Sequence, residues 1–211
     1  MDPRLLLRLP RWLVNLGRLL AAAVPQPRST GEVDDLVVAR AKQGDQAAFA
    51  DIVRHYDHRL RALAFRLLGD RDRMGDVLQE AYVKAYRSLP DFQGASGLGT
   101  WLYRITYNAC VDDLRRRPAT AQPADDPERA ASVVDPRPGP DDVAVGRRDL
   151  SAALDRLPAD QRAAVLLVDA YGLDYADAAS VLGVRAGTIG SRLSRARAAL
   201  RDVLDAGGGG R

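Results

Sequence analysis

Apolar residues recur at intervals of three and four along two stretches of the chain, which is the period of one face of an α-helix. In the first stretch, a long helix is expected after Gly44-Asp45, and Gly69 should end it. Its apolar stripe consists of Phe49, Ile52, Val53, Tyr56, Leu60, Leu63, Ala64 and Leu67. The same period predicts three more helices, at 34–41, 70–89 and 100–117. This stretch should therefore form a four-helix unit.

The second stretch has the spacing of a helix-turn-helix. Helices are predicted over 159–171 and 174–182, then a turn at Gly183-Val184 and a last helix from about Ala186. The apolar residues that would pack these helices together are Ala178, Ala179, Leu182, Val184, Ile189, Leu193, Ala196 and Leu200. Neither stretch shows the alternation of a strand, so the predicted fold class is all-α, with two small helical domains.

Proline, glycine and charge divide the chain into five parts. Residues 118–149 hold six prolines, with seven acidic against four basic side chains, a composition typical of an extended, flexible linker. The predicted parts are an N-terminal extension (1–31), the four-helix domain (32–117), the linker (118–149), the helix-turn-helix domain (150–206) and a glycine-rich tail (207–211).

Composition narrows the class of protein. The 211 residues are 46% hydrophobic and 28% charged, which is globular, and the net charge is only +3. The single cysteine, Cys110, excludes an internal disulfide and a cysteine-rich zinc site, and it fits the reducing cytoplasm. The only histidines are His55 and His58, so we expect no metal and no cofactor. The sequence contains no run of 18 apolar residues, so we expect no membrane-spanning helix.

Positive charge is concentrated on the last predicted helix, where five arginines and no acidic residue lie between positions 185 and 201. A basic helix that follows a glycine turn and a short partner helix is typical of DNA recognition. A solvated, arginine-rich amphipathic helix is the alternative. On a recognition helix, the residues opposite Ile189 and Leu193 would face DNA; these are Arg185, Thr188, Ser191, Arg192 and Arg195.

The helix at 100–117 carries a second stripe that we expect to be exposed, made of Trp101, Arg104, Asn108 and Arg115. A glycine-rich loop at 94–99 precedes it. Such a loop beside an aromatic ring and an amide could hold an unstacked base of single-stranded DNA. The alternative is that Trp101 belongs to the core and Asn108 is an ordinary surface residue.

Several motifs together resemble bacterial RNA polymerase sigma factors of the extracytoplasmic-function group, in the sigma-70 family. They are Asp76-Val-Leu-Gln-Glu-Ala-Tyr82, Thr100-Trp-Leu-Tyr-Arg-Ile105 with Asn108 and Asp112, Leu157-Pro158, and the run from Gly187 to Arg197. The resemblance covers about residues 32–206, with its motifs in the family order.

The resemblance implies that the first domain binds core polymerase and opens the minus-10 element, while the second reads the minus-35 element as duplex. Residues facing the clamp helices of the largest subunit would be Asp76, Gln79, Glu80 and Val83; the alternative is an ordinary polar helix face. Minus-10 contacts would come from Phe92, Ser96, Leu98, Thr100, Trp101, Arg104, Asn108 and Arg115. Minus-35 contacts would come from Arg185, Thr188, Ser191, Arg192, Arg195 and Arg197.

Further partners follow by similarity alone: the beta flap of the polymerase and an anti-sigma factor that holds the protein inactive, sometimes at a membrane. The sequence departs from the family at two positions. Leu98 stands where an aromatic residue is common, and Gly190 stands where Lys or Arg is common. The first departure bears on the minus-10 base preference. The second removes a phosphate contact and weakens the helix by roughly 1 kcal/mol relative to Ala.

The N-terminal 30 residues lie outside the resemblance and carry five arginines against one aspartate. Between residues 4 and 20, arginines and Asn15 fall on one side of a helical wheel and leucines with Trp12 fall on the other, interrupted by Pro10. Three interpretations stay open: a disordered extension, a start codon placed too far upstream, and a helix that binds a membrane surface or a regulator.

Three functions compete at this point. The first is a promoter-specificity subunit of polymerase that is not itself an enzyme, acting in a stress or envelope response. The second is a stand-alone helix-turn-helix regulator, which would leave the motif at 76–82 unexplained. The third is an enzyme, but the sequence shows no nucleophile elbow, phosphate-binding glycine loop or metal-ligand spacing.

Overall fold

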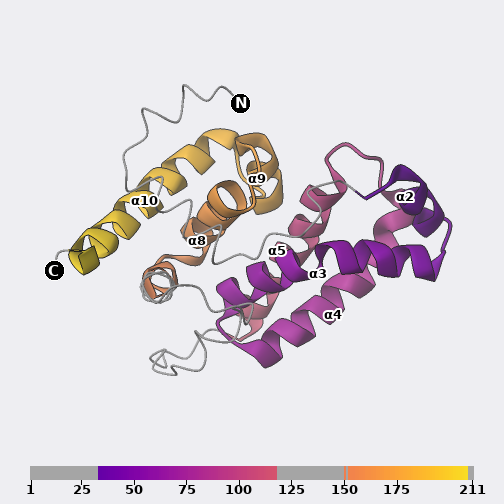
Figure 1. Ribbon diagram of the computed structural model, residues 1–211, viewed down its shortest axis with the longest axis horizontal. Helices are drawn as coiled ribbons and strands as arrows, with labels where there is room; N and C mark the ends of the chain where they lie inside the picture. Colours follow the sequence, from indigo (N-terminus) through magenta and orange to yellow (C-terminus); the bar gives the residue numbers. More distant parts are fainter. Residues whose placement is uncertain (1–32, 118–149, 151, 209–211) are drawn as a thin grey trace.

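The computed structural model describes residues 33–117, 150 and 152–208, and every regular element in these ranges is helical (Figure 1). This confirms the all-α fold class. The first unit consists of α2 (Asp35–Lys42), α3 (Gln46–Leu68), α4 (Arg71–Ser88), the short η2 (Leu89–Asp91) and α5 (Leu98–Arg116). The second consists of α8 (Ala159–Val165), η3 (Leu166–Ala170), α9 (Tyr175–Leu182) and α10 (Ala186–Gly208). The N-terminal extension and the linker lie outside the described residues.

Aspartate side chains begin four of these helices. Asp34, Asp45, Asp70 and Asp174 each accept a hydrogen bond from a backbone N–H of the first turn. The N–H of Ala48 and the guanidinium of Arg40 lower the pKa of Asp45. Gly69 and Gly183 end α3 and α9 in the left-handed conformation that glycine adopts without steric cost. These aspartate and glycine residues therefore set the boundaries of the helices.

The core of the first unit is the apolar stripe of α3 packed against α4 and α5. Ile52, Leu60 and Leu63 are at most 1% exposed. In the first turn of α4, Arg73 forms hydrogen bonds of 2.6 and 2.8 Å to the buried Asp113 carboxylate of α5. The Arg73 guanidinium also donates to the Arg117 carbonyl at 3.1 Å, which ties α4 to the end of α5.

In the second unit, the expected helix-turn-helix core is confirmed. The residues that are at most 7% exposed include Ala178, Ala179, Leu182, Ile189, Leu193, Ala196 and Leu200. The single helix expected over 159–171 is wrong in detail, because it widens into the π-turn η3 after Val165. The last helix also continues to Gly208, into the segment expected to be a tail.

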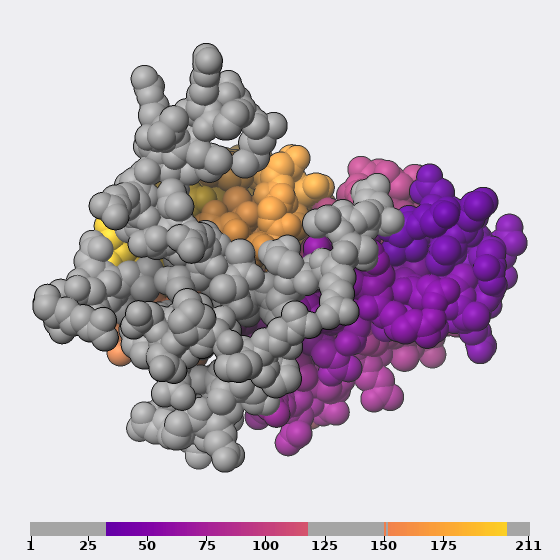
Figure 2. Space-filling view, in the orientation of Figure 1, coloured from indigo at the N-terminus to yellow at the C-terminus, as the bar shows by residue number. Residues whose placement is uncertain are grey.

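The two units pack directly on each other, which the sequence did not predict. The rings of Tyr103 in α5 and Tyr171 after η3 stack with centroids 5.2 Å apart and an interplanar angle of 5°. The Tyr171 hydroxyl donates to the Arg59 carbonyl at 3.2 Å, and Arg162 donates to the Arg66 carbonyl at 2.7 Å. In the space-filling view, the orange surface of the second unit meets the indigo and magenta surface of the first (Figure 2).

Candidate nucleic-acid interface

The solvent-facing side of α10 begins directly after the Gly183 turn. The Val184 N–H donates to the Ala179 carbonyl at 3.0 Å, which fixes the angle between α9 and α10. Arg185, Ser191 and Arg195 are exposed, and neither arginine forms an ion pair with an acidic residue of the described chain. Thr188, half-buried, lies beside them. These four side chains form the outer face of α10, which matches the chemistry of phosphate and guanine contacts.

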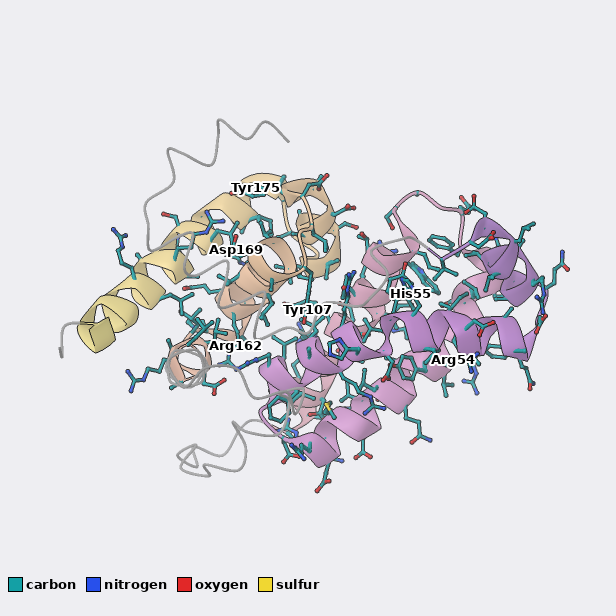
Figure 3. The ribbon with its side chains drawn as sticks, in the orientation of Figure 1. Arg54, His55, Tyr107, Arg162, Asp169 and Tyr175 are labelled. Carbon is teal, nitrogen blue, oxygen red and sulfur yellow. The ribbon has the colours of Figure 1, made fainter. Side chains whose placement is uncertain are left out.

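Two of the arginines expected to contact DNA are held by carboxylates within the second unit. Arg192 forms an ion pair with Asp160 of α8 at 3.0 Å, and its side chain is 20% exposed. Arg197 donates two hydrogen bonds, of 2.6 and 3.0 Å, to Asp169 of η3. These bonds raise the pKa of the Arg197 guanidinium. Asp169 is labelled within the second unit in Figure 3.

The expectation that Arg192 projects opposite the buried stripe of α10 is therefore wrong. Arg192 lies three residues beyond Ile189, which is only about 60° away around a helix axis. This places its side chain at the edge of the buried stripe, where Asp160 can reach it. In this arrangement, the outer face keeps Arg185 and Arg195 as its unpaired cations, while Arg192 and Arg197 secure α10 to α8 and η3.

Gly190 lies on α10 beside the half-exposed ring of Tyr175, the first residue of α9. A Cβ built at Gly190 would meet only the Tyr175 ring, at an ordinary contact distance of 3.8 Å. Packing therefore does not require glycine at this position.

The four residues expected to face polymerase lie together along one groove on α4. Asp76, Gln79, Glu80 and Val83 line it with Lys84, Arg87, Ser88 and Asp91. The Val83 side chain is 44% exposed, and the Glu80 carboxylate pairs with Arg116 of α5 at 3.1 Å. The family resemblance had singled out these residues, and their spacing of three and four positions places them on one face of α4.

A contact that the sequence did not predict holds α4 against α3, on the side away from the groove. Tyr82, which lies on α4 between the groove residues, donates from its hydroxyl to the Asp57 carboxylate of α3 at 2.6 Å. Asp57 also accepts two hydrogen bonds from Arg61. Burial and the bond to Asp57 raise the pKa of Tyr82. The pair fixes the rotation of α4 against α3, so the groove residues point outward.

The stripe expected to be exposed on α5 is exposed only in part. Trp101 is 8% exposed, because the Phe92 ring folds back onto it with centroids 5.1 Å apart. Thr100 is also 8% exposed. Asn108 and Arg115 lie on the surface, as expected. The structure therefore bears out the alternative interpretation, in which Trp101 belongs to the core, and the expectation of an exposed Trp101 was wrong.

Ser96 of the preceding loop and Leu98, the first residue of α5, are both half-buried, and Leu98 packs against the core. Arg104, one turn further along α5, reaches toward the second unit, and its guanidinium lies 3.4 Å from the Ser180 hydroxyl of α9. Burial raises the pKa of the neighbouring Tyr107, which also experiences the charges of Arg192 and Asp160. One side of α5 therefore faces the helix-turn-helix, and its minus-10 candidates lie partly at this junction.

The described residues offer no other kind of site. No group of three or more His, Cys, Asp or Glu side chains in these ranges could hold a metal ion. None of the described helices has the length and apolarity needed to span a membrane. Cys110 is fully buried, and burial raises the pKa of its thiol to about 12.

Comparison with known protein families gives two matches, in the same order as the two units. The model for Sigma-70 region 2 matches residues 52–120, and the model for Sigma-70, region 4 matches residues 147–200. These ranges hold the α4 groove and the outer face of α10, respectively.

Proteins with similar sequences are RNA polymerase sigma factors. The ECF RNA polymerase sigma factor SigE of Mycolicibacterium smegmatis is 40% identical over 167 residues, which is 76% of this chain and 64% of SigE. The RNA polymerase sigma-H factor of Pseudomonas aeruginosa is 36% identical over 185 residues, which is 83% of this chain and 95% of that factor.

Among solved structures, the sigma factor RpoE of Bartonella quintana, in complex with the anti-sigma factor NepR, superposes with a TM-score of 0.56. It is 32% identical and covers 74% of this chain and 97% of its own.

Proposed function

The chain belongs to the extracytoplasmic-function group of sigma-70 family sigma factors, the subunits that direct promoter-specific transcription by RNA polymerase, and we propose that its two helical units divide this work. The α4 groove binds the clamp helices of the largest polymerase subunit, and the outer face of α10 binds the minus-35 duplex. The observation that carries the proposal is that both surfaces are exposed and lie within the matching family regions.

The minus-10 role belongs to the segment from Phe92 to Arg115. The polar end of this surface is Asn108 and Arg115, both exposed on α5. Trp101 supports the loop from below, because its ring is buried against Phe92. Capture of unstacked bases by such a loop would drive promoter opening without chemistry on a nucleotide, so the protein acts as a regulator and not as an enzyme.

A regulatory partner completes the proposal. The related RpoE was solved with an anti-sigma factor, and we extend this kind of partner to the present chain. We place the protein in the cytoplasm, with promoter DNA, and its activity in a stress or envelope response. The domain limits of 32–117 and 150–206 and the roles of the extension and linker stay predictions, as does contact of the beta flap.

Binding to core polymerase tests the proposal against a stand-alone DNA-binding regulator. Full-length wild type should co-elute with core, and Glu80→Ala should weaken the affinity roughly tenfold, a loss of about 1.4 kcal/mol. Arg116→Ala is the matched control, because it removes only the exposed ion pair with Glu80. Exposed pairs contribute only about 0–1 kcal/mol, so both variants should melt within a few degrees of wild type.

If wild type fails to bind core, the chain is a stand-alone regulator. Equal losses for Glu80→Ala and Arg116→Ala would show that the ion pair, and not the Glu80 carboxylate itself, is what matters in the groove.

A further inference from the structure

The loop at 93–97 joins η2 to α5, and the structure fixes it firmly at both ends. At its start, the Phe92 N–H donates to the Leu89 carbonyl at 3.0 Å, and the Phe92 ring packs on Trp101. At its far end, the Trp101 N–H donates to the Gly97 carbonyl at 3.0 Å, which closes the first turn of α5.

The far end of the loop is also confined by α3. A Cβ at Gly99 would lie 3.0 Å from Cε1 of Tyr56, a ring that is 5% exposed. That distance is tighter than most contacts of a real Cβ, so a side chain at position 99 would require the Tyr56 ring to shift, and α5 begins close against α3. The five loop residues therefore span a gap whose two ends hold a set position.

A third contact on Phe92 comes from the N-terminal helix. The half-buried Lys42, the last residue of α2, donates from Nζ to the Phe92 carbonyl oxygen at 2.7 Å. The two residues are 50 positions apart in sequence. This bond holds the peptide unit that follows Phe92, and so it sets the direction in which the chain enters the loop. Lys42 lies outside the range that the region 2 family model matches.

We propose that Lys42 is a positioning residue for minus-10 recognition, because its ammonium group holds the loop at 93–97 in the conformation that accepts an unstacked base. This rests on the proposed role of the loop in the sigma factor. A loop that is held in place before binding loses less conformational entropy when a base enters it. Lys42 does not touch DNA in this proposal and acts through the Phe92 carbonyl.

Three variants separate positioning from charge. Lys42→Met removes the ammonium group and keeps an apolar side chain of similar length. Lys42→Arg keeps a charged donor. Arg40→Met removes the same charge from the same helix, but Arg40 pairs with Asp45 and does not contact the loop.

The test uses holoenzyme assembled from core polymerase and each full-length variant. The probe is a fluorescein-labelled single strand with the minus-10 non-template sequence of a promoter found by run-off transcription, and a scrambled strand serves as reference. The measured quantity is the ratio of the two dissociation constants. Lys42→Met should reduce this preference about tenfold, the effect of losing one hydrogen bond to a charged group. Lys42→Arg should stay within about twofold of wild type, and Arg40→Met should match wild type.

The outcomes distinguish the proposed minus-10 role of the loop from the proposed role of Lys42. Absence of any preference in wild type would refute the minus-10 role of the loop itself. A normal preference in Lys42→Met would refute only the role of Lys42. An equal loss in Arg40→Met would show a charge effect in place of positioning. If Lys42→Met melts below the assay temperature, Lys42→Leu, which also has no hydrogen-bond donor, takes its place, and full preference in that variant would count against the proposal.

Discussion

The aromatic rings of Tyr103 and Tyr171 lie parallel, with centroids 5.2 Å apart, and they join the two helical units of the sigma factor. Helix α9 contacts both α5 and α10, so these two helices are separated by about one helix. The minus-10 and minus-35 elements are about 25 base pairs apart, or about 85 Å of B-DNA. If α5 and α10 bind these two elements as proposed, the packed arrangement cannot reach both together, and we expect the units to separate on a promoter.

Weakening the contact between the units should therefore favour the separated form. Tyr171→Ala removes the stacked ring and the bond to the Arg59 carbonyl, and truncation of a packed aromatic typically costs about 3–5 kcal/mol. Tyr171→Phe keeps the ring and should lose only about 0.5–1.5 kcal/mol. Energy transfer between dyes on α4 and α10 should fall in free Tyr171→Ala, but not in Tyr171→Phe. Unchanged transfer in Tyr171→Ala would show that other contacts hold the units together.

The arginines of α10 should separate into two functional groups. Arg195→Ala should weaken minus-35 duplex binding and reduce its salt dependence by about one phosphate contact, with little change in stability, because Arg195 is exposed. Arg197→Ala should lower the free energy of unfolding by about 1–3 kcal/mol, because the largely buried Asp169 carboxylate loses the two hydrogen bonds that it accepts from Arg197.

Salt-dependent DNA binding and urea unfolding measure the two effects on the same protein samples. If Arg195→Ala proves destabilising and Arg197→Ala affects only DNA binding, the assignment of the two groups is reversed.

Two glycines should respond to alanine in opposite ways. Gly190→Ala should raise the free energy of unfolding by about 0.5–1 kcal/mol, because the new methyl group meets only Tyr175 at an ordinary distance. Gly99→Ala should lower it by about 1 kcal/mol or more, because the methyl group would press on the buried Tyr56 ring. Thermal unfolding of both variants checks the sign, and a stabilised Gly99→Ala would mean that the Tyr56 ring yields.

Stability should fall at alkaline pH because buried tyrosine and cysteine side chains resist ionisation, among them Tyr103 and Cys110. Burial raises the pKa of Tyr103 from 10.0 to about 12 and that of Cys110 from 9.0 to about 12. Their contribution is complete below the pKa values of the unfolded chain and is lost as pH rises toward the folded values. Urea midpoints should therefore decrease between about pH 9 and pH 12.

Tyr103→Phe keeps the stacked ring and removes the ionisable hydroxyl. The fall in its urea midpoint above about pH 10 should be shallower than that of wild type. An identical pH profile in the two proteins would show that ionisation of Tyr103 does not contribute.

The helical period was enough to predict the helices and the buried stripe of the helix-turn-helix, because these depend on neighbours three and four residues apart. The groove residues Asp76 to Val83 came from the family resemblance and not from the helical period, although their spacing places them on one face of α4. The helical period does not define where the buried face of α10 ends and its exposed face begins. For this reason Arg192 was assigned to the DNA side, although it forms an ion pair with Asp160.

Contacts between residues that are far apart in the sequence leave no periodic pattern along the chain. Trp101 is buried by Phe92, which arrives through a loop, and the Phe92 carbonyl is bound by Lys42 from a helix 50 residues earlier. The stacking of Tyr103 on Tyr171 joins units that the sequence separates by a proline-rich stretch. Each of these depends on tertiary packing, for which a single sequence gives no periodic signal.

Run-off transcription tests the central claim most directly. Purified full-length protein and core RNA polymerase are combined on pooled genomic fragments from the source organism, with core alone as the control. The account predicts discrete new transcripts that share an upstream element and that disappear with Arg195→Ala. Transcripts identical to those of core alone, from a protein shown to be folded and bound to core, would contradict it.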